Sequence, residues 1–461
     1  MKFPKIRVRY QPELTLHLPA HGRGPGIPPD LNSLFKYSPA SWDLPELPTI
    51  GGPLESNGAV IYSQRSMAER WGARHCWYGV NGATSMLQVA LLAAAAPGNR
   101  VLMPRNVHRS ILNGCVLGQI QPVLFNLPFD PFTGLWGLPS PQKFSEILLA
   151  AGEIIAVILL HPTYQGLAGD LTKLVQLSHD HGIVVIVDEA HGTHFSTAPD
   201  QLPKSALCAS ADLVIGSLHK SAGGISQSSV LWLQHKRVNH INVERALFWL
   251  QTSSPSTLLL SSVESSLDYL ASKKGYFMLQ RALEIGYQLR HRLISAEFPL
   301  VLNQDPLRLI LNTSALGISG IEADIRLMEE GLIAELPEPG CLTFCLGISP
   351  SQNVGDKILP ILSRFRKKLS SKPLESFPVP PLPQIAELAL SPQKAWYSIK
   401  EMVALENATG RIAADIICPY PPGIPILYPG ERIDPQRILW LQQQHAFWPK
   451  QISNEIAVIA D

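Results

Sequence analysis

Between residues 62 and 234 the sequence alternates short apolar runs with segments of helical periodicity, and this alternation constrains the fold more than any other feature. The apolar runs at 154–160 and 183–187 are typical of buried strands. Between them, Asp170 is placed to cap a helix that Gly182 would end. Strands that alternate with helices in this way form a parallel sheet with crossover helices. The sequence therefore predicts an α/β body with a mainly parallel sheet.

The segments that flank this body predict further units. The first sixty residues are rich in proline and glycine, which interrupt regular elements, so we expect an N-terminal arm over 1–60. A large domain then covers 61–299, and a small α/β domain covers 300–370. The proline-rich stretch 368–383 is the clearest linker. We expect a smaller α+β domain at the C-terminus, over 385–461.

Charge, hydropathy and cysteine content exclude several classes of protein. The 461 residues include 38 Lys+Arg and 37 Asp+Glu, a net charge of +1, without a basic run. We therefore expect neither nucleic acid nor an anionic membrane as a partner. The longest apolar stretches are far shorter than the roughly 20 residues that span a bilayer, and the N-terminus lacks the apolar region of a signal peptide. Six scattered cysteines without zinc-like pairing indicate reduced thiols in a cytoplasmic protein.

Two strands of the predicted sheet are followed directly by ionisable side chains. The strand at 183–187 leads into Asp188, and a strand at 211–216 leads into Ser217 and Lys220. In open parallel sheets, ligands bind just outside the carboxyl ends of the strands. We therefore expect these side chains to meet in one site.

A third cluster is suited to an anion. Thr84 and Ser85 immediately precede a helix-forming run over 86–96. A helix N-terminus offers unpaired backbone N–H groups and the positive end of the helix dipole, and the two hydroxyl groups add further donors. The cluster predicts a phosphate site.

A phosphate site, a strand-end aspartate and a later strand-end lysine are together what pyridoxal phosphate requires from a protein. The aspartate keeps the pyridine nitrogen protonated, which makes the ring an electron sink, and the lysine holds the aldehyde carbon as a Schiff base. Each residue alone is weak evidence, because a strand-end aspartate is as often a helix cap or a magnesium ligand. The ordered combination predicts a pyridoxal-phosphate enzyme with Lys220 and Asp188 at its centre.

Further motifs resemble the Orn/Lys/Arg decarboxylases, a family with the type I, aspartate-aminotransferase-like fold of pyridoxal-phosphate enzymes. The segment 105–110 (RNVHRS) resembles the one whose histidine stacks on the cofactor ring, which implies this role for His108. The strings 188–191 (DEAH) and 217–220 (SLHK) resemble the family's pyridine-nitrogen and Schiff-base motifs. Segments near both ends are also similar, so the resemblance covers roughly residues 14 to 435.

The resemblance implies a role for each residue of these motifs. The implied catalytic residues are Lys220, His108, Asp188 and His219, and Lys220 or His219 would return a proton to the α-carbon of the substrate. The implied cofactor-binding residues are Thr84, Ser85, His108, Asp188, Ala190, His191, Ser217, His219, Lys220 and Thr252. Among them, Ala190 packs against the ring and Thr252 reaches the phosphate, across a dimer interface.

The implied reaction is decarboxylation of a basic amino acid to carbon dioxide and a polyamine precursor, with arginine favoured over lysine and ornithine. The resemblance also implies a homodimer or a dimer of dimers. The chain looks like a short form that lacks the N-terminal wing domain of the large members and so cannot build their ring-shaped decamer. Gln165 stands where the large enzymes carry aspartate, and Ala20 and Gly22 depart from the family's N-terminal segment, so the motifs identify the fold better than the substrate.

Several interpretations remain open. The sequence does not say which carboxylate binds the far end of the substrate: Glu189 is expected to be a structural neighbour of Asp188, and the pair at 329–330 to lie on a solvated helix face. His191 and His194 lack the further ligands of a metal site. One alternative is an aminotransferase or lyase with the same cofactor, and an arginine that clamps the α-carboxylate of the substrate would favour aminotransfer. The other alternative is a non-catalytic homologue that binds a ligand or partner.

Overall fold

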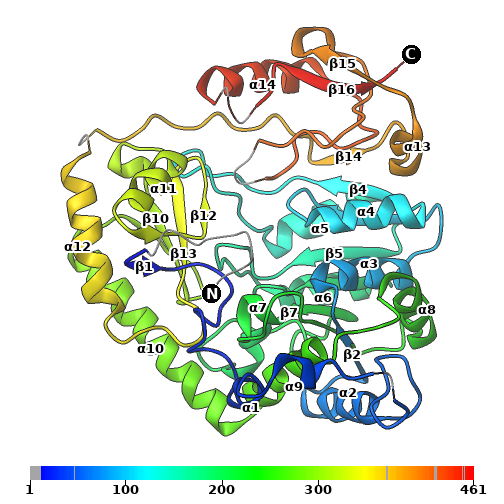
Figure 1. The fold of residues 1–461 in the computed structure, drawn as a ribbon. Helices are drawn as coiled ribbons and strands as arrows, with labels where there is room; N and C mark the ends of the chain where they lie inside the picture. The colour runs from blue at the N-terminus through cyan, green and yellow to red at the C-terminus, as the bar shows by residue number, and fades with distance from the viewer. Residues whose placement is uncertain are drawn as a thin grey trace.

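The computed structural model describes residues 12–45, 47–369, 372–419, 423–448, 450 and 452–460. Figure 1 shows a large sheet with its helices, a smaller unit beside it at the left, and a C-terminal domain above both. The predicted arm includes residues 1–11, which lie outside the described residues. Residues 420–422, in the segment near the C-terminus that resembles the family, lie outside them too.

An eight-stranded sheet forms the centre of the molecule. Its strands are β2 (His75–Gly79), β3 (Arg100–Pro104), β4 (Gln121–Phe125), β5 (Ala156–Leu160), β6 (Val184–Asp188), β7 (Leu213–Ser217), β8 (Ser229–Leu233) and β14 (Ile385–Glu387). They lie in the order β14-β4-β3-β5-β6-β7-β8-β2. The five strands from β4 to β7 are parallel, whereas β8 is antiparallel to both of its neighbours and β14 is antiparallel to β4. The predicted mainly parallel sheet is confirmed.

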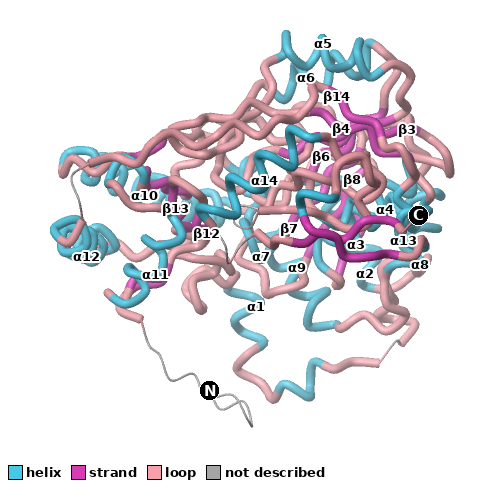
Figure 2. Tube along the Cα trace, turned by 90° about the horizontal axis from the view of Figure 1, so that it is seen from above, coloured by secondary structure: helices cyan, strands magenta, loops and turns pink. Residues whose placement is uncertain are grey.

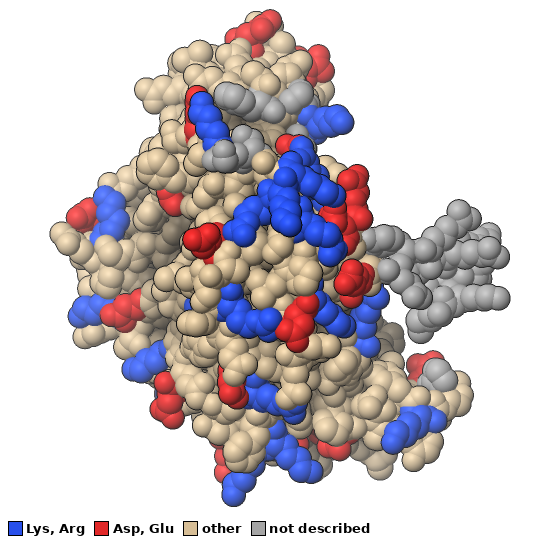
Figure 3. Space-filling model, turned by 90° about the vertical axis from the view of Figure 1, so that its left-hand side faces the viewer, with Lys and Arg blue, Asp and Glu red and all other residues tan. Residues whose placement is uncertain are grey.

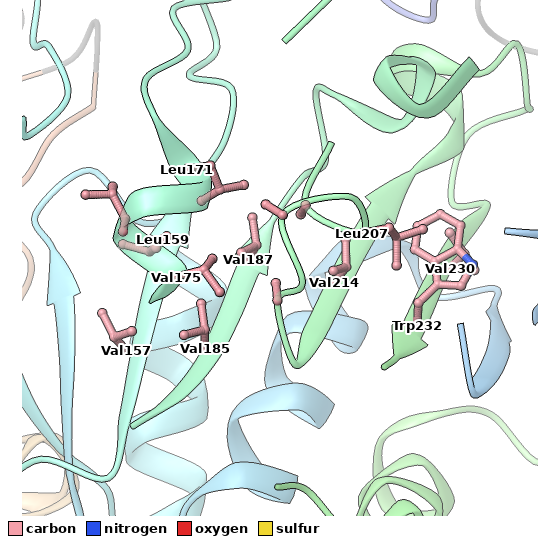
Figure 4. Close-up of a cluster of buried hydrophobic side chains, with 14 of the residues drawn as sticks. Val157, Leu159, Leu171, Val175, Val185, Val187, Leu207, Val214, Val230 and Trp232 are labelled. Carbon is pink, nitrogen blue, oxygen red and sulfur yellow. The ribbon is translucent and has the colours of Figure 1, made fainter. Parts of the chain in front are cut away.

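Helices cover both faces of this sheet. One face carries α2 (Ala59–Arg70), α5 (Pro141–Ala151), α6 (Leu171–Asp180) and α9 (Thr257–Leu270), and the other carries α3 (Gly82–Ala94), α4 (Arg109–Gly118) and α8 (His240–Leu250). The view from above separates α5 and α6 from α3, α4 and α8 (Figure 2). Because successive side chains of a strand point to opposite faces, Val157 and Leu159 of β5 join one core while Ile158 joins the other. Figure 4 shows the first core, with Leu171 and Val175 of α6 over Val185 and Val187 of β6.

The unit β5–α6–β6 shows why the sequence folds in this way. Asp170 accepts the backbone N–H of Lys173 at 3.1 Å and so caps α6, as predicted. Gly182 follows the helix with a φ of +73°, a conformation that glycine adopts without steric cost. The two strands begin and end within two residues of the predicted bounds. The sequence pattern therefore locates the elements that carry the site.

A smaller antiparallel sheet lies beside the large one. Its strands are β9 (Leu300–Val301), β10 (Arg308–Asn312), β12 (Leu336–Pro337) and β13 (Cys341–Cys345), in the order β12-β13-β10-β9, and its helices are α10 (Lys273–Ser295), α11 (Gly320–Glu329) and α12 (Val354–Lys367). Its apolar core includes Ile285 and Leu289 of α10 and Leu16 of the arm. The small unit is thus built from more of the chain than residues 300–370.

Within its described residues, 12–45 and 47–58, the N-terminal arm forms short elements, as expected: β1 (Leu14–Thr15), α1 (Pro29–Leu34) and the 3-10 helix η1 (Pro39–Trp42). Strand β1 pairs in parallel with β11 (Leu332–Ile333) of the small unit. Ala20 then accepts the N–H of Ile348 at 3.2 Å and donates its own N–H to the carbonyl of His219 at 2.8 Å. The arm therefore connects the small unit with the segment that holds Lys220.

The linker and the C-terminal domain complete the described chain. The proline-rich linker runs along the upper side of the molecule from α12 to β14 (Figure 1). Strand β14 pairs with β4 at the edge of the large sheet, so the C-terminal domain itself begins beyond it. That domain holds α13 (Pro392–Tyr397), α14 (Pro435–Phe447), β15 (Lys400–Ala404) and β16 (Glu455–Ile459). None of the helices described here has both the length and the apolar character needed to cross a bilayer.

Charges of both signs are interspersed on the face shown in Figure 3, which is the side of the molecule that carries α12. Glu330, for example, pairs with Arg364 and Lys368. Glu329 is exposed at the end of α11. Both glutamates thus lie at the surface end of a helix, as expected, and are no candidates for binding a buried substrate.

Candidate active site

Strand β7 and the short helix α7 (Leu218–Ser221) place Lys220 at the carboxyl edge of the large sheet. The Nζ atom of Lys220 lies 3.2 Å from Nε2 of His191 and 5.6 Å from the ring centroid of Tyr164. Burial lowers the pKa of Lys220, and the negative charge of Asp188 only partly opposes this effect. A neutral lysine amine is the form that bonds to a carbonyl carbon.

Asp188 ends β6, the neighbouring strand, and is 5% exposed. Burial raises the pKa of Asp188, while the amine of Lys220 and the N–H of Ala190, 3.1 Å from Oδ1, lower it. A buried carboxylate needs a cation to remain ionised at little cost. The protonated ring nitrogen of pyridoxal phosphate is such a cation, so Asp188 fits the predicted cofactor.

Two histidines beside Lys220 are held in the neutral form. Burial lowers the pKa of His191 well below its ordinary value, and the charge of Lys220 adds to the effect. The same two causes lower the pKa of His219 to about 4. The Nδ1 atom of His219 lies 3.2 Å from the hydroxyl of Ser217, whereas Nδ1 of His191 is buried without a hydrogen-bond partner. At neutral pH both imidazoles are therefore uncharged, and each has one nitrogen that donates and one that accepts a hydrogen bond.

His108 caps the N-terminus of α4, where its Nδ1 atom accepts the N–H of Ser110 at 3.3 Å. Neighbouring atoms displace water from part of the ring, and this desolvation, with the charges of Lys220 and Arg109, lowers the pKa of His108 to about 4. His108 remains exposed, and no direct contact joins it to Lys220 among the described residues. Its position against a cofactor ring stays a prediction.

The predicted phosphate cluster lies in the first turn of α3, which begins at Gly82, four residues before the predicted run. The hydroxyl of Ser85 donates to the carbonyl of Gly82 at 3.1 Å, so it is already used within the turn. Thr84 is exposed. The donors presented to an anion are therefore the first-turn N–H groups and the hydroxyl of Thr84.

Thr252 lies in the exposed loop that follows α8, where the carbonyl of Leu250 accepts the side-chain N–H of Asn81, the residue before α3, at 3.2 Å. Within the described chain its hydroxyl accepts the N–H of Ser254 at 3.2 Å. Together with the end of α8 and residues 47, 48 and 51–57 of the arm, it lines a hollow. A contact between Thr252 and a phosphate stays a prediction that needs a second chain.

Three residues outside the predicted motifs reach the site. Tyr164 donates its hydroxyl to the carboxylate of Glu335, and the other oxygen of Glu335 accepts the N–H of Leu18 at 2.7 Å. Arg308, the first residue of β10, is buried and donates from Nη2 to the carbonyl of Lys220 at 3.3 Å, while its Nε has no partner. Tyr164 directly precedes Gln165, the residue that stands where the large decarboxylases carry aspartate. Nothing in the sequence pattern indicates Arg308 or Glu335, because both belong to the small unit.

The amide of Gln165 donates to Glu338 of the small unit at 2.7 Å. Glu338 is buried, its second oxygen has no partner, and burial raises its pKa to about 8. Glu189, in contrast, accepts the N–H of Ala206 at 2.6 Å and has the structural role expected of it. The Nε2 atom of His194 lies 3.4 Å from a carboxylate oxygen of Asp305 in the small unit.

Comparison with known families matches residues 8–346 to "Orn/Lys/Arg decarboxylase, major domain" and residues 382–448 to the C-terminal domain of the same enzymes. The chain belongs to the Orn/Lys/Arg decarboxylase family. An arginine decarboxylase of Bacillus anthracis is 30% identical over 445 residues, which cover 93% of this chain and 90% of that protein. The constitutive lysine decarboxylase of Escherichia coli is 22% identical over 485 residues, covering 83% of this chain and 67% of that protein.

Solved structures of this family have the same fold. The lysine decarboxylase of Francisella novicida superposes with a TM-score of 0.78 at 16% identity, over 94% of this chain and 81% of that one. The serine palmitoyltransferase of Sphingomonas wittichii reaches 0.59 at 19% identity, over 77% and 88%. The predicted type I fold is therefore confirmed. Because the chain belongs to this family, its cofactor is pyridoxal phosphate. Lys220 is suited to bond to the aldehyde carbon of this cofactor, and Asp188 is suited to pair with its ring nitrogen.

Proposed function

We propose that this family member decarboxylates a basic amino acid, arginine first and then lysine or ornithine, to carbon dioxide and a polyamine precursor. The observation that carries the proposal is the half-buried amine of Lys220, whose pKa is lowered, in a site that also holds Asp188 and the carboxylate of Glu335. The arginine decarboxylases among its relatives support the choice of substrate.

Each residue has a role that its surroundings support. When bound, pyridoxal phosphate supplies an electron sink for the electron pair that carbon dioxide leaves behind. Lys220 would hold the cofactor at its aldehyde carbon and release it when the amine of the substrate binds there. Asp188 would keep a proton on the ring nitrogen, and His108 would contact the ring. Lys220 or His219 would return a proton to the α-carbon.

Glu335 is the carboxylate that we assign to the far end of the substrate. A basic side chain that enters a desolvated site needs an anion, because an unpaired buried cation is costly. Glu335 already accepts hydrogen bonds from Tyr164 and Leu18. A carboxylate has about four acceptor positions, so it can take further bonds from a guanidinium or ammonium group.

Arg308 favours a second candidate, an aminotransferase with the same cofactor. Its buried guanidinium lies beside Lys220 with Nε unpaired, which suits the α-carboxylate of an amino acid. An arginine that retains this carboxylate favours aminotransfer, whereas a decarboxylase has to release it. The two reactions are distinguished by their products: carbon dioxide in one case, an amino group transferred to an added 2-oxo acid in the other.

We also propose a homodimer or a dimer of dimers in the cytoplasm. A second chain would bring Thr252 to the phosphate of the first, since the exposed Thr252 is bonded only locally within its own chain. A reducing compartment is supported by the cysteines, because all six lie in the described part of the chain and none forms a disulfide there.

The proposal is tested with Lys220→Ala, and Lys236→Ala, at an exposed lysine, is the matched control. The parent and the control should show the visible absorbance of lysine-bound cofactor and release labelled carbon dioxide from carboxyl-labelled arginine. Lys220→Ala should lose both. Release at the parent rate by Lys220→Ala would overturn the assignment of Lys220, and cofactor absorbance without carbon dioxide from any of the three substrates would favour aminotransfer.

Glu335→Gln tests the assignment of substrate recognition. We expect its KM for arginine to rise about tenfold or more, since a charge-assisted bond is lost, with a smaller change in kcat. Glu329→Gln, at the surface end of α11, is the control and should keep the parent KM. An unchanged KM in Glu335→Gln would show that another group binds the far end of the substrate.

A further inference from the structure

A buried ion-pair cluster joins the C-terminal domain to the segment that leads into His108. Arg105 directly follows β3 and is fully buried. Its Nη1 and Nη2 atoms donate to the two carboxylate oxygens of Glu431, at 3.0 and 2.6 Å. Arg437 of α14 donates to the same carboxylate at 2.9 Å. The cluster thus couples positions 326 residues apart in the chain.

The backbone around this cluster is fixed by the same domain. The hydroxyl of Tyr428 donates to the carbonyl of Arg105 at 3.0 Å, and the N–H of Tyr428 donates to Glu431 at 2.8 Å. Burial disfavours the charged form of Glu431, yet the charges of Arg105 and Arg437 outweigh it and hold the pKa of Glu431 below its ordinary value. Glu431 is therefore an anion throughout the neutral pH range.

Only two residues separate Arg105 from His108, and they form a tight turn in which the N–H of Val107 donates to the carbonyl of Pro104 at 3.3 Å. His108 then begins α4 as its cap. Helix α13 of the C-terminal domain packs against α4. The segment that carries His108 is therefore held at both of its ends by the C-terminal domain.

We propose that Glu431 is a positioning residue: by holding Arg105 it sets the place of His108 in the cofactor site. The C-terminal domain thereby takes part in cofactor binding through the β3–α4 segment. This inference rests on the role proposed above for His108. Stability alone is a weak reason for such a cluster, because apolar side chains of similar size often stabilise a buried position as well as an ion pair does.

The test uses Glu431→Gln in the full chain and three measurements: the dissociation constant of pyridoxal phosphate, the visible circular dichroism of the bound cofactor, and the thermal midpoint of the cofactor-free protein. Glutamine carries no negative charge, and its NH2 group cannot accept the bonds that Oε2 of Glu431 takes from Arg105 and from the N–H of Tyr428. We expect the dissociation constant to rise about tenfold or more, with a changed dichroism signal, because the signal reports how the ring is set. The thermal midpoint reports the purely structural part of the effect.

Two control variants remove a carboxylate without touching the pair between Arg105 and Glu431. Asp434→Asn removes another partner of Arg437, and Glu387→Gln removes the partner of Arg100 at the start of β3. Both should keep the parent dissociation constant and dichroism. Arg105→Lys keeps the charge but loses the two-point geometry of the guanidinium, so it should weaken cofactor binding even if Glu431→Gln does not fold.

His108→Ala decides whether the effect acts through His108. In the His108→Ala background, Glu431→Gln should not raise the dissociation constant of the cofactor any further, since coupled residues give non-additive changes. The same loss in both backgrounds, or parent values for Glu431→Gln and Arg105→Lys, would overturn the inference. A parent protein that does not bind pyridoxal phosphate would instead overturn the proposed function.

Discussion

His161 is a buried histidine directly after β5, with an exposed fraction of 2%. Its Nε2 atom lies 3.0 Å from the carbonyl of Lys204, and burial lowers the pKa of His161 from 6.5 to about 4. The unfolded chain therefore binds a proton at a higher pH than the folded chain does. The contribution to stability is complete above pH 6.5 and is lost as the pH falls through 4.

We predict that this residue alone removes about 2 kcal/mol of unfolding free energy between pH 8 and pH 5. In His161→Gln the side chain can still donate to Lys204 but does not titrate, so the pH dependence should be shallower by that amount. Denaturant unfolding of the cofactor-free protein at the two pH values measures the difference. A His161→Gln variant with the full pH dependence of the parent would contradict it.

At the residue scale, the sequence predicts what is local to strand ends. Asp188 and Lys220 come together because the carboxyl ends of parallel strands meet at one edge of the sheet. Arg308 and Glu335 belong to a second sheet, and its packing against the first depends on tertiary contacts that no spacing encodes. The hydroxyl of Ser85 was predicted to bind phosphate, but it donates to the carbonyl of Gly82 instead. This bond could not be predicted because it depends on where α3 begins.

At the element scale, the approach of the arm to the site depends on Gly347. Its φ is +72°, and a Cβ atom there would lie 2.3 Å from the carbonyl oxygen of Ala20. Ala20 in turn donates to the carbonyl of His219. Displacement of the arm at Gly347 would therefore disturb the segment of Lys220.

We predict that Gly347→Ala costs more than the roughly 1–2 kcal/mol of a left-handed backbone conformation and also lowers activity. Gly182→Ala is a matched control, because Gly182 has a φ of +73° and open space around its Cβ position. Gly182→Ala should lose only the unfolding free energy that corresponds to the left-handed conformation, and it should keep the parent activity. Thermal unfolding and turnover of the two variants are compared; equal losses in both would exclude a role for the contact with Ala20.

Long elements with regular periodicity are predicted well, as β5, α6 and β6 show. Shorter elements are not. Strand β14, of three residues, joins the large sheet although it follows the linker, and the two-residue strand β1 pairs with β11. So few residues carry no periodic pattern, and their partners are chosen by the tertiary fold.

At the scale of the whole molecule, α8 exposes two large aromatic side chains, Phe248 and Trp249, each 77% exposed. They precede Thr252 by only a few residues. Exposed apolar groups of this kind are typical of protein–protein interfaces. Their position supports a dimer in which Thr252 meets the second chain.

We predict that Trp249→Asp dissociates the proposed dimer and weakens cofactor binding, because Thr252 would then be separated from the phosphate site that we assign to it on the other subunit. Sedimentation velocity gives the mass, and cofactor titration gives the affinity. Phe132→Asp, at an aromatic residue that is 70% exposed elsewhere, should leave both unchanged. A monomeric parent with full cofactor affinity would contradict the proposed assembly.

The pair of Arg105 and Glu431 has a consequence for biosynthesis. Ribosomes add about 5 to 20 residues per second, so roughly 16 to 65 s separate the synthesis of the two partners. Throughout that interval, Arg105 lacks the carboxylate that binds it in the complete chain. The same is true of any chain released before residue 431. If Glu431 sets the place of His108 as proposed, a chain that ends before residue 431 should bind the cofactor less tightly than the complete chain does.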